Sequence, residues 1–267
     1  MKYRTLAVLP WVVAIAFACA ALALGDRQST VLALQNEAGK ALALVGCFAA
    51  ALAFERGDYL RLAWLLLGGC YLLLLVNDGL GVSDATAGMS LARGVVVTVA
   101  NASSVAGTWM LARAWIVAGL DEEDESRRRR RMMFAGTAVL ALAITGWYLV
   151  HDLRALLGGN MDASVSIASD LGDCVVLALV APVLHTALAM RGGLLRWPWG
   201  LLTASGVAWL VYDATSGTID ALHVGPGLAL VASEGLRLVA NGYVFGAGVA
   251  QRMAVAPGER GTIPPET

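Results

Sequence analysis

The chain has 267 residues, of which 58% are hydrophobic and only 15% are charged, and its formal net charge is −1. Soluble globular domains are less apolar and carry more charge than this, so the composition excludes an ordinary soluble domain. We therefore predict an all-α integral membrane protein. The lipid bilayer is its expected partner, and no nucleic-acid partner is expected.

Eight apolar segments follow one another along the chain, each comparable in length to the roughly 30 Å hydrocarbon layer of a membrane. They cover approximately residues 5–24, 36–55, 60–79, 95–119, 134–156, 164–190, 197–213 and 227–251. The sequence thus predicts about eight transmembrane helices. The seventh segment is short, so seven spans is the alternative count.

The basic residues are distributed unevenly between the predicted loops. Thirteen of the nineteen fall on one side: Lys2, Arg4, Arg56, Arg61, Arg127 to Arg131, Arg191, Arg196, Arg252 and Arg260. Lys and Arg concentrate in cytoplasmic loops of multi-pass proteins. We therefore expect both termini in the cytoplasm and a multi-pass protein of the bacterial cytoplasmic (inner) membrane.

The two halves of the chain share a pattern that indicates an internal repeat. Residues 56–64 align without a gap to residues 191–199 with Arg, Gly, Leu, Arg and Trp in common, and Asp78 then aligns with Asp213. Two four-helix copies, 1–120 and 133–255, are expected to be parallel because each has an even number of helices. Residues 121–132 would form a charged cytoplasmic linker, and residues 256–267 a short cytoplasmic tail.

Charged side chains inside the predicted spans concentrate toward one membrane face. Charges within a membrane usually face a protein interior or a water-filled cavity. We therefore expect a polar funnel that opens to the outer, or periplasmic, side and binds a small ligand or ion. Its candidate residues are Glu37, Lys40, Asp78, Arg93, Asp170, Asp173, Asp213, Glu234 and Arg237.

Three of the charged pairs have a spacing of three residues, which places both members on one helix face. Glu37 with Lys40, and Glu234 with Arg237, can neutralise each other and could be purely structural. Asp170 and Asp173 have no cation on their own helix, and two close carboxylates resist ionising together. Their compensation could come from other helices, from a retained proton or from a bound cation, and the sequence does not identify a metal.

Four other residues are candidates for helix packing. Asn101 and Asn241 lie deeper in the predicted spans, where an amide can bridge two helices by a hydrogen bond. Gly242 and Gly246 form a small-xxx-small pattern that lets a second helix approach closely. That second helix could belong to this chain, to another copy of it or to a membrane protein partner.

A further pattern comprises Asp170-x-Gly-Asp173, Arg191-Gly-Gly, Trp197-Pro-Trp and a span that ends with Tyr212-Asp213. It resembles the multi-helix membrane sensor regions of bacterial diguanylate cyclases and histidine kinases, mainly over residues 165–250. The resemblance implies a module that receives an outer or intramembrane cue and passes it to a cytoplasmic output. Only a short tail follows residue 255, so we expect that output to be a separate partner protein.

The sequence contains no strong catalytic motif, such as His-Glu-x-x-His or Gly-x-Ser-x-Gly, and we expect no enzyme activity. The favoured interpretation is a sensor-like membrane module that binds a small ligand or cation and signals through a partner. A small cation-coupled or proton-coupled transporter is one alternative, and an accessory subunit of a membrane complex is another. No cofactor is indicated, although an apolar cleft could hold a pigment or a quinone.

Overall fold

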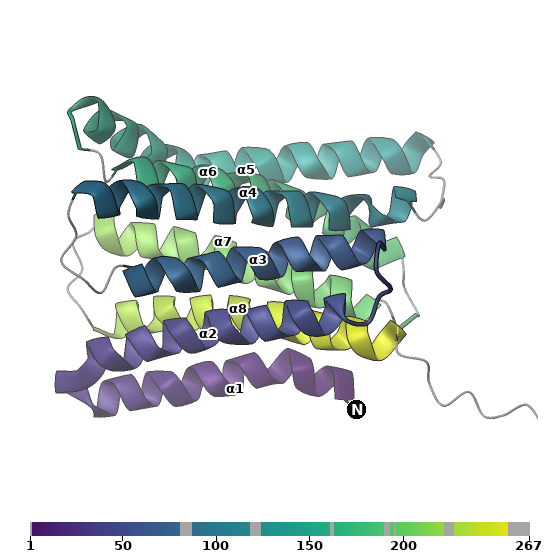
Figure 1. The fold of residues 1–267 in the computed structure, drawn as a ribbon, viewed down its shortest axis with the longest axis horizontal. Coiled ribbons are helices and arrows are strands. Elements are labelled where there is room, and N and C mark those ends of the chain that lie inside the picture. Colours follow the sequence, from purple (N-terminus) through teal and green to yellow (C-terminus); the bar gives the residue numbers. More distant parts are fainter. Residues whose placement is uncertain are drawn as a thin grey trace, which may run out of the picture.

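The computed structural model describes residues 2–80, 87–117, 124–160, 163–189, 193–194, 196–221 and 227–255. In these ranges the chain is helical, as predicted, and its long helices run alternately in opposite directions (Figure 1). They are α1 (Lys2–Ala23), α2 (Gln28–Ala51), α3 (Tyr59–Leu80), α4 (Ala87–Val117), α5 (Asp124–Leu157), α6 (Ala163–Ala189), α7 (Arg196–Ala221) and α8 (Leu228–Val255), with a short 3-10 helix, η1 (Gly25–Arg27), between the first two.

Five stretches in the described part of the chain are long and apolar enough to cross a membrane: Tyr3–Ala23, Tyr59–Gly79, Ala92–Ala114, Ser166–His185 and Leu228–Val255. A sixth is obtained if α5, which bends by 44° between Trp147 and Leu149, counts as one span. These helices identify a multi-pass membrane protein. The remaining helices, α2 and α7, contain polar residues such as Lys40 and Asp213 that lower their hydropathy.

Six helices pack in a closed ring, in the order α2, α3, α4, α6, α7, α8 and back to α2. The helices α1 and α5 lie outside this ring, since α1 packs mainly against α8 and α5 packs mainly against α6. Two runs of three consecutive helices, α2 to α4 and α6 to α8, therefore form the two halves of the ring. The contacts between α2 and α8 and between α4 and α6 join these halves.

Glycines allow the ring helices to approach closely. A Cβ added at Gly46 of α2 would collide with the backbone of Phe245 in α8, and one added at Gly248 would collide with the backbone of Gly46. A Cβ at Gly172 of α6 would lie only 2.7 Å from the side chain of Asn101 in α4. Membrane helices associate through this kind of close packing because lipid offers no hydrophobic drive between them.

The outer surface of the bundle carries many large apolar side chains, whereas the interior contains both apolar and polar side chains. Large exposed hydrophobic residues such as Val8, Val12 and Ile15 of α1, and Val139 and Leu142 of α5, face outward. Lipid is the appropriate solvent for these surfaces.

Three helices begin earlier than the hydropathy of the sequence predicts: α2, α5 and α4, which starts at Ala87 rather than near residue 95. α2 starts at Gln28 rather than near residue 36, and α5 starts at Asp124, so residues 124–132 of the expected linker are helical. Residues 121–123 of that linker, and the whole tail 256–267, lie outside the described residues. Arginine is a good helix former and Asp124 complements the helix dipole at the first turn, which explains the extension of α5.

Candidate functional site

A cavity of about 300 Å³ lies inside the ring, and every one of the six ring helices contributes to its wall. We call this cavity the chamber. Its polar and aromatic lining comprises Asn36, Lys40, Cys70, Tyr71, Asn101, Ser104, Thr108, Ser169, Asp173, Ser205, Trp209, Asp213 and Arg237. The wall also contains apolar side chains, among them Leu67, Leu74 and Val176.

The charged residues of the chamber lie well inside their helices. Lys40 is about halfway along α2. Asp173, Asp213 and Arg237 each lie about a third of the way along their helices, measured from the end of the bundle at which α2, α4, α6 and α8 begin.

Lys40 is the centre of the first charged cluster. Its ammonium pairs with Asp78 of α3 and lies 3.5 Å from the carboxylate of Glu37, one turn before it on α2. The Lys40 side chain is only 12% exposed. Asp78 is further linked to Asn77, whose amide oxygen accepts a 3.4 Å hydrogen bond from Nε of Arg93 at the beginning of α4.

Arg237 of α8 is the centre of the second cluster. Its guanidinium pairs with Glu234 on the same helix and lies over the ring of Tyr212 in α7, 5.5 Å from the ring centroid. The buried Gln35 of α2 donates a 2.7 Å hydrogen bond to the backbone carbonyl of Glu234. These contacts hold Arg237 at the junction of α2, α7 and α8.

Three acids on the α6 and α7 side of the ring form no ion pair with a Lys or Arg that the structure describes. Asp170 and Asp173 of α6 and Asp213 of α7 lie within electrostatic range of one another, and none of them pairs with a described Lys or Arg. The Oδ2 atoms of Asp170 and Asp213 are buried without a hydrogen-bond partner in the described part of the chain. Asp173 and Asp213 both line the chamber.

The wall of the chamber also supplies aromatic surface. Tyr71 of α3 and Trp209 of α7 both line it, and the Trp209 indole lies within hydrogen-bonding reach of the Tyr71 hydroxyl. An aromatic face attracts a nearby cation through its quadrupole. Carboxylates and aromatic rings around one cavity are chemically suited to an organic ammonium group.

A tight metal site is not found in the described part of the chain. No group of three or more His, Cys, Asp or Glu side chains within it converges closely enough to hold a metal ion. Cys47, Cys70 and Cys174 are buried and free, and each lies on a different helix.

The nine predicted site residues separate into two groups. Lys40, Asp173, Asp213 and Arg237 line the chamber. Glu37, Asp78 and Glu234 are outside the lining and pair with Lys40 or Arg237, whereas Asp170 and Arg93 are outside it without such a pair, and Arg93 bonds to Asn77. Tyr71 and Trp209 were missed by sequence reasoning. Asn36, Ser169 and Trp209 each lie four residues before a charged lining residue, a helical spacing that could have indicated them.

The predicted packing residues occupy contacts between helices. Asn101 lines the chamber and donates a 2.9 Å hydrogen bond from Nδ2 to the carbonyl of Ala168 in α6. Asn241 is buried against Gly39 of α2. Gly242 and Gly246 face α1, where an added Cβ would lie 2.7 Å from Pro10 or 3.3 Å from the carbonyl of Leu6.

Comparison of the chain with protein-family models, with curated proteins and with solved structures found no match.

Proposed function

We propose that this protein is a sensor-like membrane module that binds a small organic ligand carrying an ammonium group, and that it signals through a partner protein. The observation that carries the proposal is the pair Asp173 and Asp213. Both acids line a cavity of about 300 Å³, and neither has a cationic partner in the described part of the chain. A buried carboxylate requires a compensating positive charge or a proton.

The expected internal repeat supports a cationic ligand. Glu37 and Lys40 of α2 have the same spacing as Asp170 and Asp173 of α6, and Asp78 of α3 aligns with Asp213 of α7. The two sets occupy equivalent places in the ring, because α6 and α7 stand in the second half where α2 and α3 stand in the first. Gly39, just before Lys40, packs against Asn241 of α8, and Gly172, just before Asp173, packs against Asn101 of α4, so these contacts favour an aspartate at the position where the first half has its lysine.

The wall of the chamber shows the same correspondence. The lining residues Leu67, Cys70 and Leu74 of α3 have the same spacing as Leu202, Ser205 and Trp209 of α7, and both series continue to an aspartate. Equivalent faces of the two helices therefore line one cavity. In the first half of the ring, the Lys40 ammonium neutralises Glu37 and Asp78. In the second half, we propose that the ammonium group of the ligand neutralises Asp173 and Asp213.

The orientation of the module follows from its charges. The exposed arginines Arg4, Arg56, Arg129, Arg196 and Arg252 lie near the end of the bundle at which α1, α3, α5 and α7 begin. Because Lys and Arg concentrate on the cytoplasmic side of multi-pass proteins, this end of the bundle is expected to face the cytoplasm. The proposal thus includes eight spans, both termini inside, and a chamber nearer the outer face of a bacterial inner membrane.

Calorimetric titration with propylammonium tests the proposal, because this cation reproduces the outer part of a lysine side chain. We expect saturable binding by the wild type and at least a tenfold weaker affinity in Asp173→Asn/Asp213→Asn, since about 1.4 kcal/mol corresponds to tenfold. Asp26→Asn is the matched control, because Asp26 is an exposed acid near the outer end and outside the chamber. Equal binding by all three proteins contradicts the proposal.

Transport is the second candidate function, and the position of the chamber favours it. The cavity lies between the two halves of the ring and approaches the middle of α2, as expected for a carrier in which two halves rock around a central site. Uptake of labelled propylammonium into proteoliposomes separates the two functions. A carrier accumulates the label inside the vesicles, whereas a receptor binds it without uptake.

A further inference from the structure

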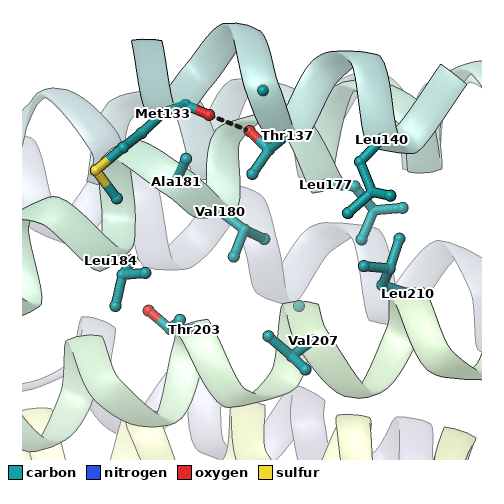
Figure 2. Close-up of a pocket in the computed structure, with 12 residues that line it drawn as sticks. Met133, Thr137, Leu140, Leu177, Val180, Ala181, Leu184, Thr203, Val207 and Leu210 are labelled. Atoms are coloured by element: carbon teal, nitrogen blue, oxygen red, sulfur yellow. Dashed lines mark hydrogen bonds between the residues drawn. The ribbon is translucent and has the colours of Figure 1, made fainter. Parts of the chain in front are cut away.

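A second cavity lies between α5, α6 and α7, on the outside of the ring. Its volume is about 410 Å³, and Met133, Leu140, Leu184, Val207 and Leu210 are among its lining side chains (Figure 2). It arises because α5 follows α6 closely but barely touches α7. We call this cavity the side pocket.

The side pocket is almost entirely apolar. Its two hydroxyl hydrogens are engaged within the protein, since that of Thr137 lies between the backbone carbonyls of Met133 and Ala178, at 3.0 and 3.1 Å, and Thr203 donates to the carbonyl of Trp199 at 2.9 Å. Figure 2 shows Leu140, Leu177 and Leu210 together at one end of the cavity. An occupant must therefore be a hydrocarbon chain.

The other end of the side pocket points toward arginines. On α5, Arg129 lies one turn before Met133 on the same helix face, and on α7, Arg196 lies two turns before Thr203 on the same face. Both arginines are exposed at the end of the bundle where α5 and α7 begin. Arginine binds phosphate by paired hydrogen bonds, so a phosphate placed there would be held directly above the apolar cavity.

We infer that the side pocket is a binding site for an anionic phospholipid, with one acyl chain between α5, α6 and α7 and the phosphate between Arg129 and Arg196. A bilayer is as apolar as the pocket, so moving a chain into it contributes little free energy. The arginines supply the affinity, and the pocket supplies the shape that selects an acyl chain.

The side pocket also shares a wall with the chamber. Leu177, Val180 and Gly206 line both cavities. A Cβ added at Gly206 would collide with Val180, so the two helices are already in close contact at this wall. A lipid chain in the side pocket would therefore contact Val180 of α6, the helix whose Asp173 lines the chamber.

Photolabelling in nanodiscs tests the inference. The probes are phosphatidylglycerol and phosphatidylcholine with the same diazirine-bearing acyl chain, and the labelled peptides are identified by mass spectrometry. With phosphatidylglycerol we expect labelling of 133–140 and 177–184 to exceed that of the lipid-facing surface of α1 by roughly fivefold or more, given the usual attraction of each arginine to anionic lipid. Phosphatidylcholine should give no such excess.

The chain offers matched variants for this experiment. Gly136 lines the side pocket with open space around it, so Gly136→Leu fills the cavity without a clash and should remove the excess labelling. Gly146→Leu is its control, because Gly146 lies on the same helix, also has open space and is outside the pocket lining. Arg129→Gln/Arg196→Gln should reduce the phosphatidylglycerol excess, whereas Arg128→Gln, on another face of α5, should not.

Three results would overturn the inference: labelling of the pocket peptides equal to that of α1, equal labelling by the two lipids, or no effect of Gly136→Leu. The comparison of the two lipids uses the wild type alone, so it remains decisive even where a variant folds poorly. None of these measurements depends on an ammonium ligand in the chamber.

Discussion

The ammonium of Lys40 in α2 pairs with the carboxylate of Asp78 in α3, inside the helix bundle. This ion pair joins two neighbouring helices of the first half of the ring. Asp213 occupies the aligned position in the second half, where no described Lys or Arg pairs with it. The two aspartates should therefore respond differently to the same substitution.

Asp78→Asn should destabilise the protein, whereas Asp213→Asn should not. Loss of the Asp78 charge leaves Lys40 with Glu37 alone, which we expect to lower the free energy of unfolding by about 1–3 kcal/mol. Asp213→Asn removes a buried carboxyl that pairs with no described Lys or Arg, and it should leave stability unchanged or raise it. Thermal unfolding of both variants in one detergent checks this, and equal losses would contradict the assignment of the two roles.

Lys40→Ala should be rescued by a small ammonium ion. The truncation removes the side chain beyond Cβ and leaves Glu37 and Asp78 facing a space of the same shape as propylammonium. We expect added propylammonium to raise the unfolding midpoint of Lys40→Ala more than that of the wild type. Lys40→Met is the control, because its side chain refills the space, and propanol is the uncharged control ligand. Rescue by propanol would show that volume rather than charge matters.

Gly248→Ala should disrupt the contact between α2 and α8. A Cβ at Gly248 would collide with the backbone of Gly46, which cannot rotate away, so we expect a loss of about 1–3 kcal/mol in stability. Gly235→Ala, on the same helix, has no neighbour within 4 Å and should stabilise slightly through higher helix propensity. Unfolding midpoints of the two variants test the prediction, which fails if both change alike.

Asn101→Ala should weaken the contact between α4 and α6. The substitution removes the 2.9 Å hydrogen bond to Ala168, and interhelical hydrogen bonds in membranes contribute about 0.6–2 kcal/mol. Thr98→Val is the matched control on α4, since the Thr98 hydroxyl bonds only within its own helix, to the carbonyl of Gly94. Chemical unfolding in mixed micelles measures both, and an equal effect would argue against a bridging role for Asn101.

The sequence predicts the helices of this protein better than it predicts their ends. Each predicted span overlaps one observed helix, because lipid-facing helices must be apolar along most of their length. The beginning of α2 was missed, since Gln28, Ser29 and Thr30 are polar but helical. The arginine run of α5 was interpreted as linker for the same reason, because hydropathy reports burial in lipid and not helix formation.

The chamber is only partly predictable from the sequence. The charged residues were identified because a charge within an apolar span is conspicuous. Which of them face a common cavity depends on the contacts between α2 and α8 and between α4 and α6, and these contacts join helices that are not neighbours in the sequence. Tyr71 and Trp209 were not identified because an aromatic residue in an apolar helix is equally suited to lipid, to the core or to a cavity.

The closure of the ring between α2 and α8 has a consequence for biosynthesis. α2 can pack against α3 early, but α1 and α2 gain their contacts with α8 only when the last helix has been made. Until then Lys40 and Asp78 can pair, but the glycine surface of α2 at Gly46 has no partner. A chain that stops before Leu228 lacks α8, so its five remaining ring helices would keep an open seam between α2 and α7 in the bilayer.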